Sequence, residues 1–122
     1  MSNKATITYL EHNTLFDSRN TSGDVGVYML RAELSLILDV YGRMVANGIW
    51  KDYALSPQKT HAIFAIYRRA AEHPLYKIIK EPALDKKQGM WRIEGPQGNI
   101  LKRGKDLANL LKYFDRLLLR TI

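Results

Sequence analysis

Apolar residues within 31–47 recur with the period of an α-helix. One stripe follows the spacing i, i+3, i+4, i+7 and i+11 and contains Leu34, Ile37, Leu38, Tyr41 and Val45. Asn47-Gly48 predicts the helix end, because glycine readily takes the left-handed conformation that closes many helices. Further apolar residues lie off the stripe, namely Leu36, Val40 and Met44. The helix is thus apolar over more than half its girth, which predicts either burial between a sheet and another element or a dimer contact.

A second amphipathic helix is predicted at residues 105–119. Its apolar stripe contains Leu107, Leu110, Leu111, Phe114 and Leu118. Gly104 is the predicted N-cap, with Asp106 in the first turn, where a carboxylate interacts favourably with the helix dipole.

Between the two helices the pattern changes to short apolar runs separated by turn residues. Five strands are predicted: Trp50–Leu55, His61–Arg68, Leu75–Lys80, Met90–Glu94 and Asn99–Lys102. Residues 63–67 are almost continuously apolar, which predicts a strand buried on both faces. Gly95-Pro96-Gln97-Gly98 predicts a hairpin turn, and the short connections indicate an antiparallel meander. The predicted fold class is α+β, with an antiparallel sheet of about five strands and the N-terminal and C-terminal helices packed on one face.

The folded part is predicted to be one domain, residues 25–122. Residues 1–24 have turn and loop chemistry without a lasting period, so we expect a flexible N-terminal segment. A chain of 122 residues is long enough to bury a core without a metal or a disulfide.

Strand alternation assigns the side chains of the middle strands to two faces. Tyr76, Ile78, Trp91 and Ile93 share one face and are predicted core, as are Trp50 and Phe64. The opposite face mixes cations with apolar groups, namely Leu75, Lys77, Ile79, Met90, Arg92 and Glu94. Arg43 and Asp52 are predicted to pair and to fix the first helix against the sheet.

The composition argues against several kinds of chemistry. The chain has no cysteine, which excludes disulfides, thiol catalysis and thiolate zinc sites and fits a cytoplasmic location. No histidine has a second ligand at metal-binding spacing, so we expect no metal and no cofactor. No signal peptide and no apolar run of membrane-spanning length is present, so no membrane contact is expected. Nucleophile elbows, paired carboxylates and phosphate-loop fingerprints are missing, so we expect no enzymatic activity and assign no catalytic residue.

Positive charge is concentrated in the second half of the chain. Residues 57–122 carry 14 Lys and Arg against 6 Asp and Glu, whereas residues 1–56 carry 5 against 6. Two short runs stand out, Arg68-Arg69 and Lys102-Arg103-x-Lys105, the second directly before the last helix. A helix N-terminus offers free N–H groups, so cations beside it suit a phosphate. The alternative is a solvated basic face, with Arg69 or Arg103 paired to Glu72, Glu81 or Asp106.

The motifs also resemble a known family. They read Leu38-x-x-Tyr41-Gly42-Arg43-Met44-Val45-Ala46-x-Gly48-x-Trp50-x-Asp52-Tyr53-Ala54, then Phe64-x-x-Tyr67-Arg68-Arg69-Ala70-x-Glu72-x-Pro74-Leu75-Tyr76, Gln88-Gly89 and Ile100-Leu101-Lys102-Arg103-Gly104-x-Asp106-Leu107. Over about residues 28–115 the chain is similar to the alphaproteobacterial family known as domain of unknown function 2794. The resemblance implies a cytosolic bacterial protein and brings no known activity, cofactor or site.

Three functions remain open on the sequence. The favoured one is a non-enzymatic module that binds nucleic acid or another polyanion, such as an acidic protein. Its predicted contacts are Arg68, Arg69, Lys77, Arg92, Lys102, Arg103 and Lys105. The first alternative is a protein-interaction module that forms a homodimer through the 31–47 helix. The least favoured is a small enzyme with a scattered site. If the two basic runs do not meet in the fold, a solvated surface is the simpler account of the charge.

Overall fold

Two helices flank five strands in the computed structural model, which describes residues 26–69 and 73–121. The elements are α2 (Arg31–Ala46), β1 (Asp52–Pro57), β2 (Ala62–Tyr67), β3 (Tyr76–Lys80), the short 3-10 helix η1 (Pro82–Leu84), β4 (Trp91–Glu94), β5 (Ile100–Gly104) and α3 (Leu107–Thr121). Each predicted element is present, with ends that differ by up to two residues. The flexible segment predicted at residues 1–24 lies outside the described residues.

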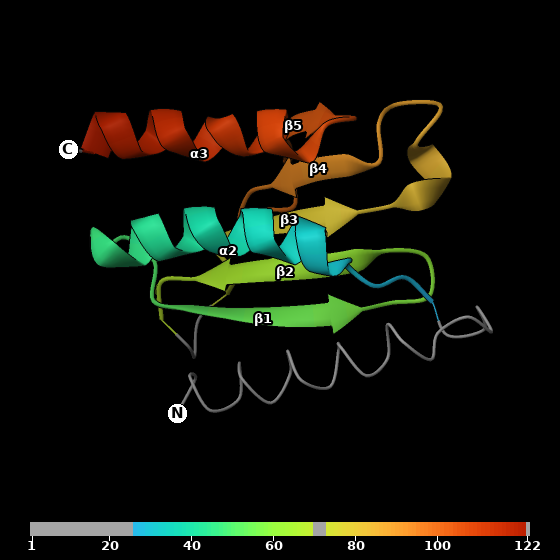
Figure 1. Ribbon diagram of the computed structural model, residues 1–122. Coiled ribbons are helices and arrows are strands. Elements are labelled where there is room, and N and C mark those ends of the chain that lie inside the picture. Colours follow the sequence, from blue (N-terminus) through green and yellow to red (C-terminus); the bar gives the residue numbers. More distant parts are fainter. Residues whose placement is uncertain (1–25, 70–72, 122) are drawn as a thin grey trace.

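The five strands form one antiparallel sheet in the order β1-β2-β3-β4-β5, as the short connections predict. Figure 1 shows α2 and α3 side by side on the same face of this sheet. The α+β prediction is therefore confirmed, including the placement of both helices on one face. Neighbouring strands run in opposite directions, so β2 and β5 end at opposite ends of the sheet.

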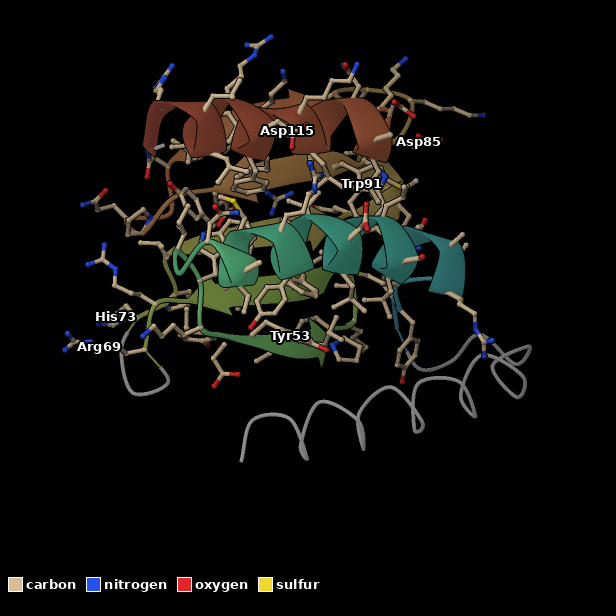
Figure 2. The ribbon with its side chains drawn as sticks, turned by 60° about the vertical axis from the view of Figure 1, so that its left-hand side comes forward. Tyr53, Arg69, His73, Asp85, Trp91 and Asp115 are labelled. Atoms are coloured by element: carbon tan, nitrogen blue, oxygen red, sulfur yellow. The ribbon has the colours of Figure 1, made fainter. Side chains whose placement is uncertain are left out.

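The core lies between the helices and the sheet, and the predicted face assignment is confirmed. Phe64, Ile78 and Ile93 are cross-strand partners on β2, β3 and β4, and each is at most 1% exposed. Trp91 is also buried, at 2% exposed, and lies beneath α3 (Figure 2). On the opposite face Ile79 is the partner of Arg92.

The rotation of α2 differs from the predicted one. Its buried residues are Leu34, Ile37, Val40 and Met44, whereas the predicted stripe residue Val45 is 41% exposed. The cause is that α2 packs against two partners at once. Tyr41 contacts Tyr53 of β1 on one flank, with ring centroids 4.8 Å apart. On the other flank α2 packs against α3. The additional apolar residues of α2 are thus used for burial between the sheet and α3.

The predicted pair of Arg43 with Asp52 is wrong. Arg43 instead bonds to Asp115 of α3, with 3.1 Å between nitrogen and oxygen, and both side chains are nearly half exposed. Asp52 accepts the backbone N–H of Tyr53 at 2.9 Å. An exposed ion pair of this kind contributes little to stability. Arg43 therefore joins the two helices and does not anchor α2 to the sheet.

An added methyl group should have opposite effects on the free energy of unfolding at two glycines, Gly42 and Gly89. Gly42 is exposed within α2 and a Cβ there would meet nothing, so Gly42→Ala should raise the free energy of unfolding by about 0.5–1 kcal/mol through helix propensity. Gly89 has φ +94° and a Cβ there would lie 2.6 Å from the carbonyl of Gly104. Gly89→Ala should therefore lower the free energy of unfolding by about 2 kcal/mol or more. Urea denaturation of both variants tests this, and a stabilised Gly89→Ala protein would contradict it.

Candidate functional site

The two basic runs do not meet. Arg68-Arg69 follows the end of β2, whereas Lys102-Arg103-x-Lys105 lies at the end of β5, three strands away and at the opposite end of the sheet. Figure 2 shows Arg69 and His73 at one end of the molecule and Asp85 at the other. The backbone at Gly104 and Lys105 lies at Asp85's end, where Gly89 contacts it closely. The seven predicted contacts therefore do not form one surface.

The run on β5 is also divided between the two faces of the sheet. Lys102 is the partner of Ile93 and so lies on the helix side, whereas Arg103 is the partner of Arg92 on the opposite side. Lys77 shares that opposite side, where its partner is Glu94. Lys102 is therefore on the other side of the sheet from Arg103 and Lys77 and cannot share a ligand surface with them.

Arg92 is neutralised within the protein. Its Nε donates to Glu94 at 2.9 Å, and its Nη1 donates to Glu81 at 2.7 Å. Burial lowers the pKa of Arg92, but the hydrogen bonds to Glu94 and Glu81 outweigh it and leave the pKa above the ordinary value. With two carboxylates already bound, Arg92 is a structural cation and a poor candidate for ligand binding.

Arg103 differs from Arg92, its cross-strand partner, in having no carboxylate bound among the described residues. Its Nη1 atom is buried and has no hydrogen-bond partner, and its side chain forms no ion pair with a described residue, so the pairing with Glu81 or Asp106 in the alternative account is wrong. Glu81 is occupied by Arg92. The carboxylate of Asp106 accepts the N–H of Asn109 at 2.9 Å.

The N-terminus of α3 is capped by its own carboxylate. Asp106 is the N-cap, two residues later than the predicted Gly104, which is the last residue of β5. An N-cap side chain bonds one of the free N–H groups at the helix start and places negative charge at the positive end of the dipole. This arrangement removes the predicted advantage of that helix end for a phosphate.

A cationic pocket lies at the other end of the sheet. It has a volume of about 410 Å³ and is lined by Gly48, Ile49, Lys51, Arg68, Arg69 and Leu75. The segments that form it are the exit of α2, the start of β1, the end of β2 and the start of β3. Among the described residues that line it there is no carboxylate. We call this feature the cationic pocket.

Lys51 is a member of the pocket that the sequence does not reveal. It lies one position beyond the strand pair Asp52↔Tyr67, beside Arg68, and its N–H donates to the Tyr67 carbonyl at 3.0 Å. The available signal is weak, because a single lysine between Trp50 and Asp52 belongs to neither basic run. The β1–β2 register alone brings it to Arg68.

The aromatic residues near the pocket are part of the core. Trp50 is 1% exposed and packs edge-on against Phe114, with ring centroids 4.9 Å apart. Burial raises the pKa of Tyr41 to about 12, with further contributions from the charge of Asp52 and from Tyr53. The Tyr41 hydroxyl therefore stays protonated at neutral pH. This cluster positions the end of α2 above the sheet.

Residues 26–69 and 73–121 contain neither a cluster of metal-ligating side chains nor a membrane-spanning helix. No three His, Asp or Glu side chains there come together in a way that could hold a metal ion. Neither helix in this part of the chain combines the length and the apolar character needed to cross a membrane.

Comparison with known proteins identifies the family of the chain but no activity. The family model described as a protein of unknown function (DUF2794) matches residues 27–111, which is more than half of the chain. No curated protein and no solved structure matches the chain. The match spans α2, all five strands and the first turn of α3, and it includes every residue of the cationic pocket. The chain therefore belongs to the DUF2794 family.

Proposed function

We propose that this domain is a non-enzymatic, cytoplasmic module that binds a phosphate-bearing polyanion, in the first instance nucleic acid. The observation that supports it is the cationic pocket, where three cations line one hollow and no carboxylate is among the described residues that line it. The set of proposed contacts is smaller than the set predicted from the sequence. It keeps Arg68 and Arg69 and adds Lys51. The run on β5 is left out because it lies at the opposite end of the sheet.

The proximity of Lys51 and Arg68 supports a binding role. Like charges at neighbouring cross-strand positions destabilise a sheet. Neither side chain has an ion pair with a described residue, and Lys51 and Arg68 are both exposed. A ligand anion between them would turn this repulsion into attraction.

A salt titration tests the proposal. Fluorescence anisotropy with labelled, mixed-sequence RNA and DNA should show binding that weakens by roughly 20- to 40-fold between 50 and 200 mM salt, as expected for about three phosphate contacts. Lys51→Ala/Arg68→Ala should weaken binding at least tenfold. Lys102→Ala/Lys105→Ala removes the same charge at the other end of the sheet and should change affinity less than threefold.

The outcomes separate the pocket from general basicity. Equal losses in both double variants would show attraction to the net charge alone and would contradict a specific site. Binding that is absent at low salt, or insensitive to salt, would contradict a phosphate contact altogether. Circular dichroism of each variant shows whether the fold is kept.

The alternative assembly module, a homodimer through α2, stays a prediction. Ser35, Asp39 and Ala46 lie on the outward face of the helix and are exposed, while Leu36 and Val45 lie on opposite flanks. Light scattering across a concentration range decides whether the chain dimerises.

A further inference from the structure

We infer that the cationic pocket is selective for a terminal phosphate, the phosphomonoester of a nucleotide or of an oligonucleotide end, over the internal phosphodiesters of a nucleic acid strand. This inference rests on the proposed function, since it names the group that the same pocket recognises. It would make the domain a reader of nucleotide phosphate ends.

The first argument is the confinement of charge. A protein that follows a nucleic acid backbone needs cations along a groove, because each strand carries one charge per about 3.4 Å. Here Lys51, Arg68 and Arg69 converge on one hollow. The next basic run is separated by three strand spacings, or about 14 Å across the sheet, and lies at its opposite end. Such an arrangement fits one compact anion better than a chain of them.

The second argument is the match of charge. A phosphomonoester carries about −1.5 to −2 charges at pH 7, because its second pKa is about 6. A phosphodiester carries only one. Lys51 and Arg68 form no ion pair with a described residue, and such cations give the larger energetic gain to the more highly charged group.

The third argument is the mixed lining of the pocket. Ile49 and Leu75 provide apolar walls beside the cations, and both are half-buried. The volume of about 410 Å³ lies within the usual range for small-ligand sites and exceeds what a phosphate alone needs. The apolar walls are therefore available for the sugar or base attached to the phosphate.

A structural role for the cations must be distinguished from binding. The pocket lies at the C-terminal end of α2, where positive side chains stabilise a helix dipole. That helix end is already satisfied by its own chain: Asn47 Nδ2 donates to the Arg43 carbonyl at 2.8 Å, and the Ile49 N–H donates to the Met44 carbonyl at 2.9 Å. The cations are thus not needed as hydrogen-bond donors there.

The test compares two single-stranded oligonucleotides of one sequence, one with a 5′-phosphate and one with a 5′-hydroxyl. Anisotropy at pH 7.5 should show at least tenfold tighter binding of the phosphorylated strand. Lys51→Ala/Arg68→Ala should abolish this preference, whereas Lys102→Ala/Lys105→Ala should keep it. At pH 5 the monoester is protonated to a monoanion, so the preference should shrink several-fold. A thermal melt of each variant reports any loss of helix stabilisation.

Competition identifies the attached group. A mononucleotide should displace the phosphorylated strand at lower concentration than inorganic phosphate. Equal potency of the two competitors would overturn the role given to Ile49 and Leu75. Equal, pocket-dependent binding of both oligonucleotides would overturn the selectivity for a terminal phosphate and leave the proposed function standing. Absence of binding by either oligonucleotide would overturn both.

Discussion

Glu33→Ala should lower the free energy of unfolding by about 3 kcal/mol, because it strands a buried cation. Lys80 is on the core face of β3 and is only 7% exposed. Its Nζ donates to Glu33 Oε1 at 2.8 Å and to the Tyr28 carbonyl at 2.9 Å. Without the carboxylate, the Lys80 ammonium keeps one neutral acceptor. The same substitution removes the hydrogen bond from the Leu30 N–H to Glu33 Oε1, which supports the start of α2.

A double-mutant cycle separates the ion pair from the helix cap. Lys80→Met replaces the buried cation by an apolar side chain of similar length, so Glu33→Ala/Lys80→Met should be more stable than Glu33→Ala by at least about 1 kcal/mol. Urea denaturation followed by tryptophan fluorescence measures this, since Trp50 and Trp91 are both buried. If the loss in the double variant equals the sum of the losses in Glu33→Ala and Lys80→Met, the ion pair contributes no coupling energy.

Phe114→Ala should cost about 3–5 kcal/mol, the range for removing a fully buried aromatic ring. Phe114 is 0% exposed on α3. Its ring contacts Trp50 edge-on at 4.9 Å and Tyr76 of β3 at 5.2 Å. It thus joins α3, the segment after α2 and the middle of the sheet at one point. Its removal leaves a cavity beside Trp50, whose emission should shift to longer wavelength.

Leu119→Ala is the matched control on the same helix. Leu119 is 76% exposed, so its loss should change stability by less than about 0.5 kcal/mol. A loss of similar size in both variants would indicate that helix propensity, and not core packing, holds α3 in place.

The elements of this fold could be predicted because each signal is local. The period of 3.6 over α3 and the alternation along β3 and β4 depend on residues a few positions apart, so the buried set that includes Ile78, Ile93 and Phe114 was available from the sequence. The meander follows from the short connections. The rotation of α2 was not predictable in the same way, because its apolar residues surround more than half of the helix and only the position of α3 selects among them.

The candidate site shows the same division. Arg68 and Arg69 were predicted as anion contacts from a run in the sequence, and the structure places both in the cationic pocket. Lys51 was not predicted. Whether the cations of β5 lie beside Arg68 and Arg69 was left open by the sequence, and the structure places them at the opposite end of the sheet. The sequence gives the charge of each residue. Which charges share one surface depends on which strand ends lie together in the fold.

The sequence by itself determined an α+β domain with two helices and a five-stranded meander, and it determined which side chains of β3 and β4 face the core. The tertiary structure alone decided that Lys80 is buried against Glu33, that Arg43 pairs with Asp115, and that the two basic runs lie at opposite ends of the sheet. The physical reason is the separation along the chain of the residues that interact. Hydrophobic period and turn chemistry act within an element, whereas ion pairs and pockets form between elements whose direction and register only the folded chain sets.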